Sequence, residues 1–155
     1  PEYQFDAVRC GIALHGFANR PEWDKKLKPV AELISSISQI HIVKKGEYVG
    51  YDFGWKVSKE TKIATIPLGH ADGISRRLGN HKGTVSINGK IAPIVGNVCM
   101  DMFMVDVTKI SCDEGDVVYV FGKENSISDL AQTADTISYE LLTAIGPRVK
   151  RVIYE

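Results

Sequence analysis

Strong net charge and long apolar runs are both missing from this sequence. Lysine plus arginine and aspartate plus glutamate each number 19 among 155 residues, so no net field draws nucleic acid or an anionic membrane toward the chain. No apolar run approaches the roughly 18 residues that cross a bilayer, and no basic segment followed by an apolar stretch opens the chain as in a secretory signal. We therefore expect neither a nucleic acid nor a membrane partner.

Cysteine and the familiar short motifs are also scarce. Cys10, Cys99 and Cys112 show no CxxC spacing, and an odd number of cysteines does not suit a secreted disulfide scaffold, so we expect a reducing cytoplasm. The phosphate-binding GxxxxGK(S/T), GxSxG and HExxH patterns are absent. The histidines are too dispersed to predict a metal site; they stand at His15, His41, His70 and His81.

Short strands are expected to dominate the chain after residue 30. Asn88-Gly89 is the strongest hairpin signal, because it separates two apolar segments at the spacing of a tight turn. Ser126 or Ser128 suits the cap of a short helix through Ala131, and a second helix is expected over residues 137–145. A helix over residues 31–38 is possible but poor, given its serines and β-branched residues. The expected strands are 62–67, 83–87, 90–95, 102–107, 116–121 and 149–154, with others on either side of residues 44–46.

This pattern predicts a mainly β fold, a small β-barrel or sandwich with two short helices. Residues 5–17 differ, because their largely apolar run is typical of a strand buried on both faces in a parallel sheet. A second such strand with a helical crossover does not follow. We therefore predict two parts: residues 1–20, a strand and linker left from a preceding domain of a longer protein, and residues 21–155, the β domain.

Three dense segments could carry chemistry. Residues 8–12 place Arg9 beside Gly11 inside the apolar run, where the arginine must reach a partner or the strand end. Residues 69–77 form a glycine-bounded turn with His, Asp and two Arg after an expected strand. Residues 96–102 read Gly-Asn-Val-Cys-Met-Asp-Met. Taken singly, each is also typical of an ordinary feature: an edge arginine, a polar turn and a bulged strand with a buried thiol.

Together, the order and spacing of these segments resemble the C-terminal part of alanine racemases, pyridoxal-phosphate enzymes built from an N-terminal eight-stranded α/β barrel and a C-terminal β domain. The similarity extends from about Phe5 to Tyr154 and rests above all on Ala-Pro-Ile-Val-Gly at 92–96 and Val-Cys-Met-Asp at 98–101. The form of residues 96–102, with Ile-Ser-Arg-Arg at 74–77, also resembles racemase halves fused to a peptidoglycan-precursor ligase. The apolar run of residues 5–17 would then be the last strand of the barrel.

The resemblance implies roles for individual residues. Tyr51 matches the catalytic tyrosine, presented across a homodimer interface to the cofactor of the other subunit. The Schiff-base lysine of the family has no counterpart here, so it would lie in the barrel outside this chain. The other matched positions are Arg9 (cofactor pyridine nitrogen), Gly11, Ile12 and Tyr139 (cofactor phosphate), Met100 (substrate carboxylate), and His70, Arg76 and Ile137 (substrate entrance).

The chemistry of racemisation suits these residue types. One group must take the α-proton from one face, and another must return a proton to the opposite face; the family uses tyrosine and the Schiff-base lysine. Arg9 keeps its own protons, so it leaves the pyridine nitrogen unprotonated and the ring a weaker electron sink. The implied function is interconversion of L- and D-alanine for peptidoglycan synthesis, in the cytoplasm, by an enzyme of which this chain alone is inactive.

Two other functions remain open from the residues. One is the β domain of a basic-amino-acid decarboxylase with the same barrel-plus-β plan, which Tyr51 and residues 98–101 disfavour. The other is a noncatalytic β-barrel interaction module, which would leave Arg9 unexplained. Convergence of Tyr51, His70 and Met100 on one exposed face is expected for the racemase function and not for a module. Which amino acid is preferred among alanine, serine and larger ones is left open.

Three residues depart from the family pattern. His70 and His15 stand where tyrosine is common, and Asn97 stands where an arginine often lies behind the catalytic tyrosine. An imidazole can replace the donor and acceptor functions of a phenol, but it also takes up a proton in mildly acidic solution.

We therefore predict that His70→Tyr in the complete enzyme preserves activity and mainly shifts the acid limb of its pH profile. Racemisation rates measured across the pH range for both forms check this. Loss of activity at every pH would show that His70 is not a tolerated substitute for tyrosine.

Overall fold

The computed structural model describes residues 5–18 and 21–154, and the chain divides into two compact units, Pro1–Ala31 and Glu32–Glu155. The first unit contains a short 3-10 helix, η1 (Ile12–His15), and one helical turn, α1 (Pro21–Asp24). Two backbone hydrogen bonds stabilise η1: Leu14 N–H donates to Gly11 C=O, and Gly16 N–H donates to Ala13 C=O, both at 3.1 Å.

The strand expected over residues 5–17 is contradicted at Ile12–His15, which form the 3-10 helix η1. Residues 5–11 have no regular secondary structure and no ladder pairing, and η1 follows directly. A strand is stabilised by hydrogen bonds to a neighbouring strand, and among the described residues no strand pairs with this segment. An apolar sequence alone does not make a ladder.

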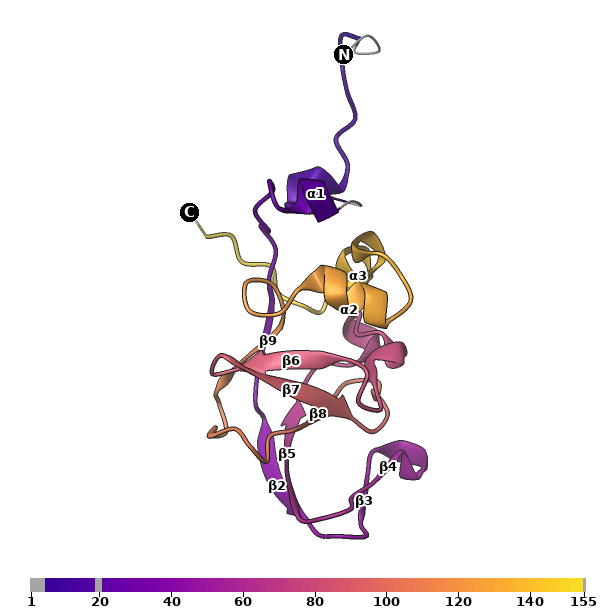
Figure 1. Cartoon of the computed structure of the whole chain (residues 1–155), viewed down its shortest axis with the longest axis vertical. Helices are drawn as coiled ribbons and strands as arrows, with labels where there is room; N and C mark the ends of the chain where they lie inside the picture. The colour runs from indigo at the N-terminus through magenta and orange to yellow at the C-terminus, as the bar shows by residue number, and fades with distance from the viewer. Residues whose placement is uncertain (1–4, 19–20, 155) are drawn as a thin grey trace. The chain divides into compact units, whose positions relative to one another are not determined.

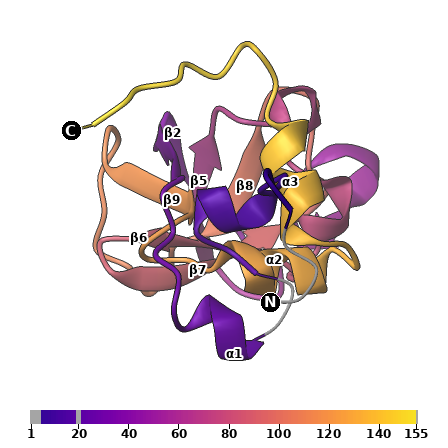
Figure 2. The ribbon, with the colours of Figure 1, turned by 90° about the horizontal axis from the view of Figure 1, so that it is seen from above.

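The second unit is built on a seven-stranded antiparallel sheet with the order β1-β9-β6-β7-β8-β5-β2. Figures 1 and 2 show its strands curling around a common interior, with the separate β3-β4 hairpin at the end of the unit opposite α2 and α3. The strands are β1 (Leu33–Ser36), β2 (Gln39–Val43), β3 (Tyr48–Val49), β4 (Trp55–Lys56), β5 (Thr61–Ile66), β6 (Thr84–Ile87), β7 (Lys90–Val95), β8 (Phe103–Asp106) and β9 (Val117–Phe121).

The two outer strands of this order are consecutive in the chain. Only Ile37 and Ser38 separate β1, which pairs with β9, from β2, which pairs with β5. Ile37 N–H donates to Asp116 C=O at 3.0 Å, while Ser38 N–H donates to Thr65 C=O at 2.9 Å. One bent segment thus joins both edges of the sheet, so the mainly β, barrel-like prediction is confirmed.

Most expected elements are present. The β6-β7 hairpin turns at Asn88 and Gly89, whose φ angles of 50° and 71° are those of the tight hairpin turn that the sequence predicts. The helices α2 (Ile127–Thr133) and α3 (Ser138–Ala144) lie where two helices were predicted. Ser126 caps α2, its hydroxyl accepting from Asp129 N–H at 3.3 Å. In the described residues no helix is long and apolar enough to span a membrane.

Two local predictions are wrong. The possible helix over residues 31–38 is instead β1 and its continuation, because pairing with β9 outweighs a weak helical preference. The expected strand over 149–154 is irregular. The Arg151 guanidinium donates to the carbonyls of Ile145, Gly146 and Val149, which curls the start of this segment.

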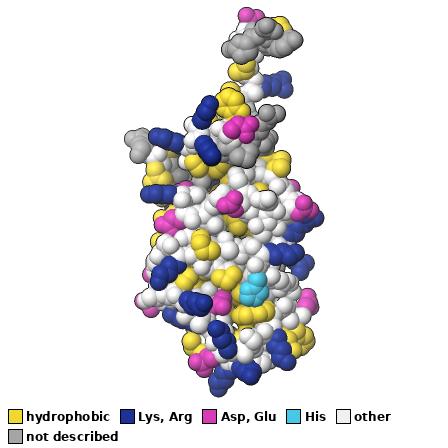
Figure 3. Space-filling model, in the orientation of Figure 1, with side chains coloured by type: hydrophobic (Ala, Val, Ile, Leu, Met, Phe, Trp, Pro, Cys, Tyr) yellow, Lys and Arg dark blue, Asp and Glu magenta, His cyan; other side chains and the backbone are white. Residues whose placement is uncertain are grey.

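The core lies on the inner face of the curled sheet. Ile94 on β7 pairs with Val105 on β8, and both side chains are fully buried. On the face drawn in Figure 3, lysine and arginine are interspersed with aspartate and glutamate. Other fully buried side chains on the inner face come from β5 to β9: Ala64, Ile66, Val85, Ile87, Ala92, Phe103 and Val118. Val95 follows Ile94 in β7 and points to the opposite face, where it packs in a second cluster with Val49, Val57, Ile63, Cys99 and Met104.

Two isoleucines on β7 give a matched stability test. Ile94 is 0% exposed and Ile91 is 55% exposed, so Ile94→Ala is expected to lower the free energy of unfolding by about 2–5 kcal/mol and Ile91→Ala by about 0.5 kcal/mol or less. Urea unfolding of both variants measures the difference. Equal losses would contradict the assignment of the core to this face.

Candidate functional site

The segment 96–102 between β7 and β8 is the centre of the site, because two loops pack against its backbone. Gly96, at φ 65°, turns the chain as it leaves β7. A bond of 2.9 Å from Cys99 N–H to Met102 C=O then closes the turn into β8. The β3-β4 hairpin packs against residues 96–97, and the loop after β5 packs against residues 99–101.

Tyr51 stands in the first of these loops, on the 3-10 turn η2 (Tyr51–Phe53) between β3 and β4. Its side chain is 72% exposed, so the phenol projects away from the core. Its carbonyl accepts a hydrogen bond of 3.0 Å from Asn97 Nδ2, and Asn97 Oδ1 accepts one of 3.0 Å from Asn80 Nδ2. Asn97 therefore anchors the backbone that carries Tyr51.

His70 begins the second loop, the 3-10 turn η3 (His70–Asp72). His70 N–H donates to Cys99 C=O and Ala71 N–H donates to Met100 C=O, both at 3.0 Å. Gly69 makes this pairing possible, because a Cβ there would lie 2.2 Å from the Met100 carbonyl oxygen. The loop and the segment 99–101 thus meet backbone to backbone.

Tyr51, His70 and Met100 are all exposed, and the backbone of each contacts the stretch 97–100 or belongs to it. Met100 is 57% exposed, and its N–H finds no acceptor among the described residues. The structure thus brings the backbones of these three residues to one short stretch of chain, and each residue is exposed there.

Cys99 is buried beneath this arrangement. Burial raises the pKa of its thiol, against smaller lowering effects from the Tyr51 backbone N–H and the charge of Arg76. A thiol that stays protonated at neutral pH packs as a small apolar group rather than acting as a nucleophile. The sulfur contacts the Asn97 carbonyl at 3.6 Å.

Beside His70 lies an open depression of about 240 Å³. Arg76, on the 3-10 turn η4 (Arg76–Leu78), and Glu140, on α3, give it one cation and one anion. Its remaining lining residues are Gly73, Ile74, Ser75, Leu141 and Ala144. Of the predicted entrance residues, His70 and Arg76 line this depression. The third, Ile137, stands 56% exposed at the N-terminus of α3.

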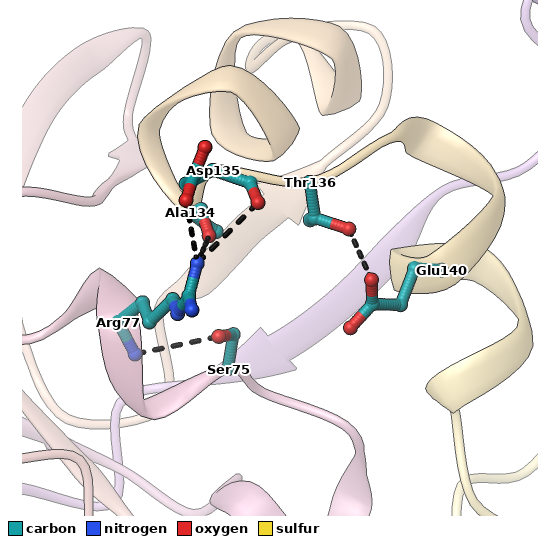
Figure 4. Close-up of polar contacts among 6 residues, drawn as sticks. All are labelled: Ser75, Arg77, Ala134, Asp135, Thr136 and Glu140. Carbon is teal, nitrogen blue, oxygen red and sulfur yellow. Dashed lines mark hydrogen bonds and ion pairs between the residues drawn. The ribbon is translucent and has the colours of Figure 1, made fainter.

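Arg77, on η4, binds the connection between α2 and α3 (Figure 4). Its Nη1 donates to Ala134 C=O at 3.1 Å, just past α2, and pairs with the Asp135 carboxylate at 3.0 Å. The Thr136 hydroxyl bonds the Glu140 carboxylate across the start of α3. These contacts hold the α2-α3 connection, which precedes Ile137 and the half-buried Tyr139.

The predicted cofactor residues Arg9, Gly11 and Ile12 belong to the first unit, not to the unit that carries Tyr51. Arg9 and Gly11 are exposed, and Ile12 is buried. Arg9 forms no ion pair with any described residue. No group of three or more His, Cys, Asp or Glu side chains in the described part of the chain could hold a metal ion.

A charge bridge that the sequence did not reveal joins Asp72, Arg148 and Asp101. Arg148 Nε lies 3.2 Å from Asp72 Oδ1, and Arg148 Nη2 lies 2.8 Å from Asp101 Oδ1. The hydrogen bond to Asp101 and the charges of both carboxylates raise the pKa of Arg148. Asp72 belongs to the glycine-bounded turn of residues 69–77, which stands out in the sequence. Arg148 lies just before the strand wrongly predicted over 149–154, and no sequence motif there indicates that it pairs with Asp72.

Comparison with known proteins gives consistent matches. Residues 30–153 match the family model described as "Alanine racemase, C-terminal domain". Alanine racemase of Clostridium kluyveri is 41% identical over 160 residues, covering 98% of this chain and 41% of that protein. The chain thus spans about two-fifths of the length of such curated relatives.

Solved structures agree. The alanine racemase from a D-cycloserine-producing Streptomyces lavendulae superposes with a TM-score of 0.88 at 36% identity, over 96% of this chain and 41% of that one. The alanine racemase of Bartonella henselae, with covalently bound pyridoxal phosphate, gives 0.83 at 35% identity, over 92% and 40%.

Gly69→Ala tests the close backbone approach at the centre of the site. Because the added Cβ would meet the Met100 carbonyl, we expect a loss of about 1–3 kcal/mol in the free energy of unfolding and faster amide exchange at His70 and Ala71. Gly89→Ala is the control: φ is 71° but nothing lies within 4 Å, so only backbone strain of about 1–2 kcal/mol is added. Unchanged exchange at His70 and Ala71 in Gly69→Ala would contradict the packing described.

Proposed function

Because this chain belongs to the alanine racemase family, as its C-terminal domain, we propose that it supplies one side of an active site that interconverts L- and D-alanine with pyridoxal 5'-phosphate. The family is one of isomerases, and the relatives described above are alanine racemases. The proposal includes the division at residues 20 and 21, a preceding barrel domain, and inactivity of this chain by itself.

The observation that carries this proposal is the exposed phenol of Tyr51 on a loop fastened to the same backbone segment as Met100. A proton donor and acceptor must reach a substrate carbon, so it cannot lie in the core. Tyr51 is 72% exposed, and Asn97 anchors its backbone at 3.0 Å. In the proposal, Tyr51 holds or takes the proton on one face of the α-carbon, and a lysine outside this chain serves the other face.

Met100 and the depression beside His70 are proposed to handle the substrate. The Met100 N–H lacks an acceptor among the described residues, so it is free to donate to a carboxylate. His70 and Arg76 line the depression through which a small zwitterion would approach, and Ile137 is the N-cap residue of the helix α3 that supplies Glu140 to it. Arg76 and Glu140 give that path both signs of charge, which suits an amino acid.

The cofactor is proposed to meet Arg9, Gly11, Ile12 and Tyr139. The exposed guanidinium of Arg9 and the exposed backbone at Gly11 are donors that suit a ring nitrogen and a phosphate. When bound, pyridoxal phosphate withdraws electrons from the α-carbon and so acidifies its proton. Arg9 holds its own protons and would moderate that withdrawal at the ring nitrogen.

The wider setting is also proposed. D-Alanine made by the complete enzyme would enter peptidoglycan synthesis in the cytoplasm, and the complete enzyme would act as a homodimer in which Tyr51 reaches the cofactor of the other subunit.

Two tyrosines of the same hairpin provide the test in the full-length protein. Tyr51→Phe removes the proton-transferring hydroxyl and is expected to lower the racemisation rate by roughly 10²- to 10⁴-fold. Tyr48→Phe, at a 46% exposed position with an edge-to-face contact to Phe53, is expected to keep the rate. Polarimetry starting from either enantiomer measures both, and equal rates for the two variants would remove Tyr51 from the mechanism.

The separated pieces complete this test. This chain alone and a separately produced N-terminal part alone are expected to show no turnover, and their mixture with pyridoxal phosphate is expected to racemise alanine. Turnover by this chain alone would contradict the proposed division of the active site. No turnover from a folded mixture would favour a noncatalytic module.

A further inference from the structure

The buried carboxylate of Asp72 has a defined set of partners. Its side chain is 5% exposed. Oδ1 lies 3.2 Å from Arg148 Nε, and Oδ2 accepts a hydrogen bond of 2.9 Å from Gly69 N–H. A buried charge is tolerated only where a cation and hydrogen-bond donors meet it. Asp72 therefore keeps the turn η3 in one position relative to Arg148.

Arg148 extends this restraint to the segment that carries Met100. Its guanidinium spans two carboxylates, because Nη2 lies 2.8 Å from Asp101 Oδ1 while Nε meets Asp72. A third tie comes from the segment after α3, where Gly146 N–H donates to Asp72 C=O at 3.1 Å. The turn η3 and Asp101 are thus held together by a side chain as well as by backbone bonds.

The direction of the Met100 N–H follows from this arrangement. The Cys99 carbonyl belongs to the same peptide group as the Met100 N–H, and it accepts from His70 N–H at 3.0 Å. The chain has no cis peptide bonds among its described residues, and in a planar trans peptide the N–H points opposite to the C=O. Whatever fixes η3 therefore aims the Met100 N–H away from it.

We propose that the bridge Asp72–Arg148–Asp101 is a positioning device that aims the Met100 N–H at the substrate carboxylate. This inference rests on the proposed function and assigns to it three residues that do not contact the reacting atoms. Asp72 and Arg148 are positioning residues: they act through His70 and Asp101 on one backbone donor. Their contribution lies in substrate binding rather than in proton transfer.

The test uses the full-length protein with Asp72→Asn, which removes the charge but keeps the shape. A misplaced donor is expected to raise KM for alanine roughly tenfold or more, with kcat changed less than about threefold. The inhibition constant of propionate, which has the carboxylate of alanine without its amine, is expected to rise by the same factor. A purely structural role would reduce the folded fraction and leave both constants of the folded enzyme unchanged.

Further variants separate the possibilities. Arg148→Lys keeps the charge but cannot span both carboxylates, so a smaller rise in KM is expected. Asp116→Asn is the matched control, since Asp116 accepts from Asn88 Nδ2 at 2.9 Å at the turn of the β6-β7 hairpin, the end remote from Gly96; its constants are expected to match wild type. Arg148→Lys and Asp101→Asn, at partly exposed positions, decide the question if Asp72→Asn does not fold.

The outcomes for the two proposals are distinct. The positioning role alone would be overturned if the wild-type enzyme is active and folded Asp72→Asn has unchanged KM and unchanged propionate inhibition. The same result in the two alternative variants would also overturn it. A fall in kcat at constant KM would overturn it as well. An inactive wild-type protein would overturn the proposed function, and calorimetric titration with propionate would then decide whether the bridge still governs carboxylate binding.

Discussion

The hydrogen bond from His70 N–H to Cys99 C=O is the contact on which the arrangement of the site depends. It joins a loop that follows β5 to the segment that precedes β8, and it is possible because Gly69 carries no side chain. Through a rigid peptide group it sets the direction of the Met100 N–H. The charge bridge at Asp72 supports this pairing, because Asp72 lies in the same turn as His70 and is held by Arg148.

The curled sheet explains how such distant segments meet. Strands β5 and β8 are adjacent partners, so the loop leaving β5 and the segment entering β8 lie at the same end of the ladder. The β3-β4 hairpin reaches the same segment through Gly50, Gly54 and Gly96, where backbone meets backbone. The sheet thus brings the loops to one end, and the glycines allow the loop backbones to pack against the same short segment.

Much of the fold was predictable because its signals are local. Asn88-Gly89 and the Ser126 cap act within a few residues, and both stand where expected. The strand predicted over 149–154 failed because apolar side chains do not supply a pairing partner, and the Arg151 side chain claims nearby carbonyls. The roles expected of Tyr51, His70 and Met100 were inferred from a family resemblance. The ion pair of Asp72 with Arg148 depends on tertiary structure alone, so no local pattern could reveal it.

The bent segment from β1 to β2 has a consequence for how the domain is made. β1 is among the first parts of the domain to leave the ribosome, but its partner β9 is among the last strands. The pairing of β1 with β9 must therefore wait until synthesis of the sheet is nearly finished. Pairing across such a sequence separation is typical of slow folding. Until then the apolar side chains of the growing sheet lack their final cover, so this domain depends on protection during translation more than a helical domain of its size does.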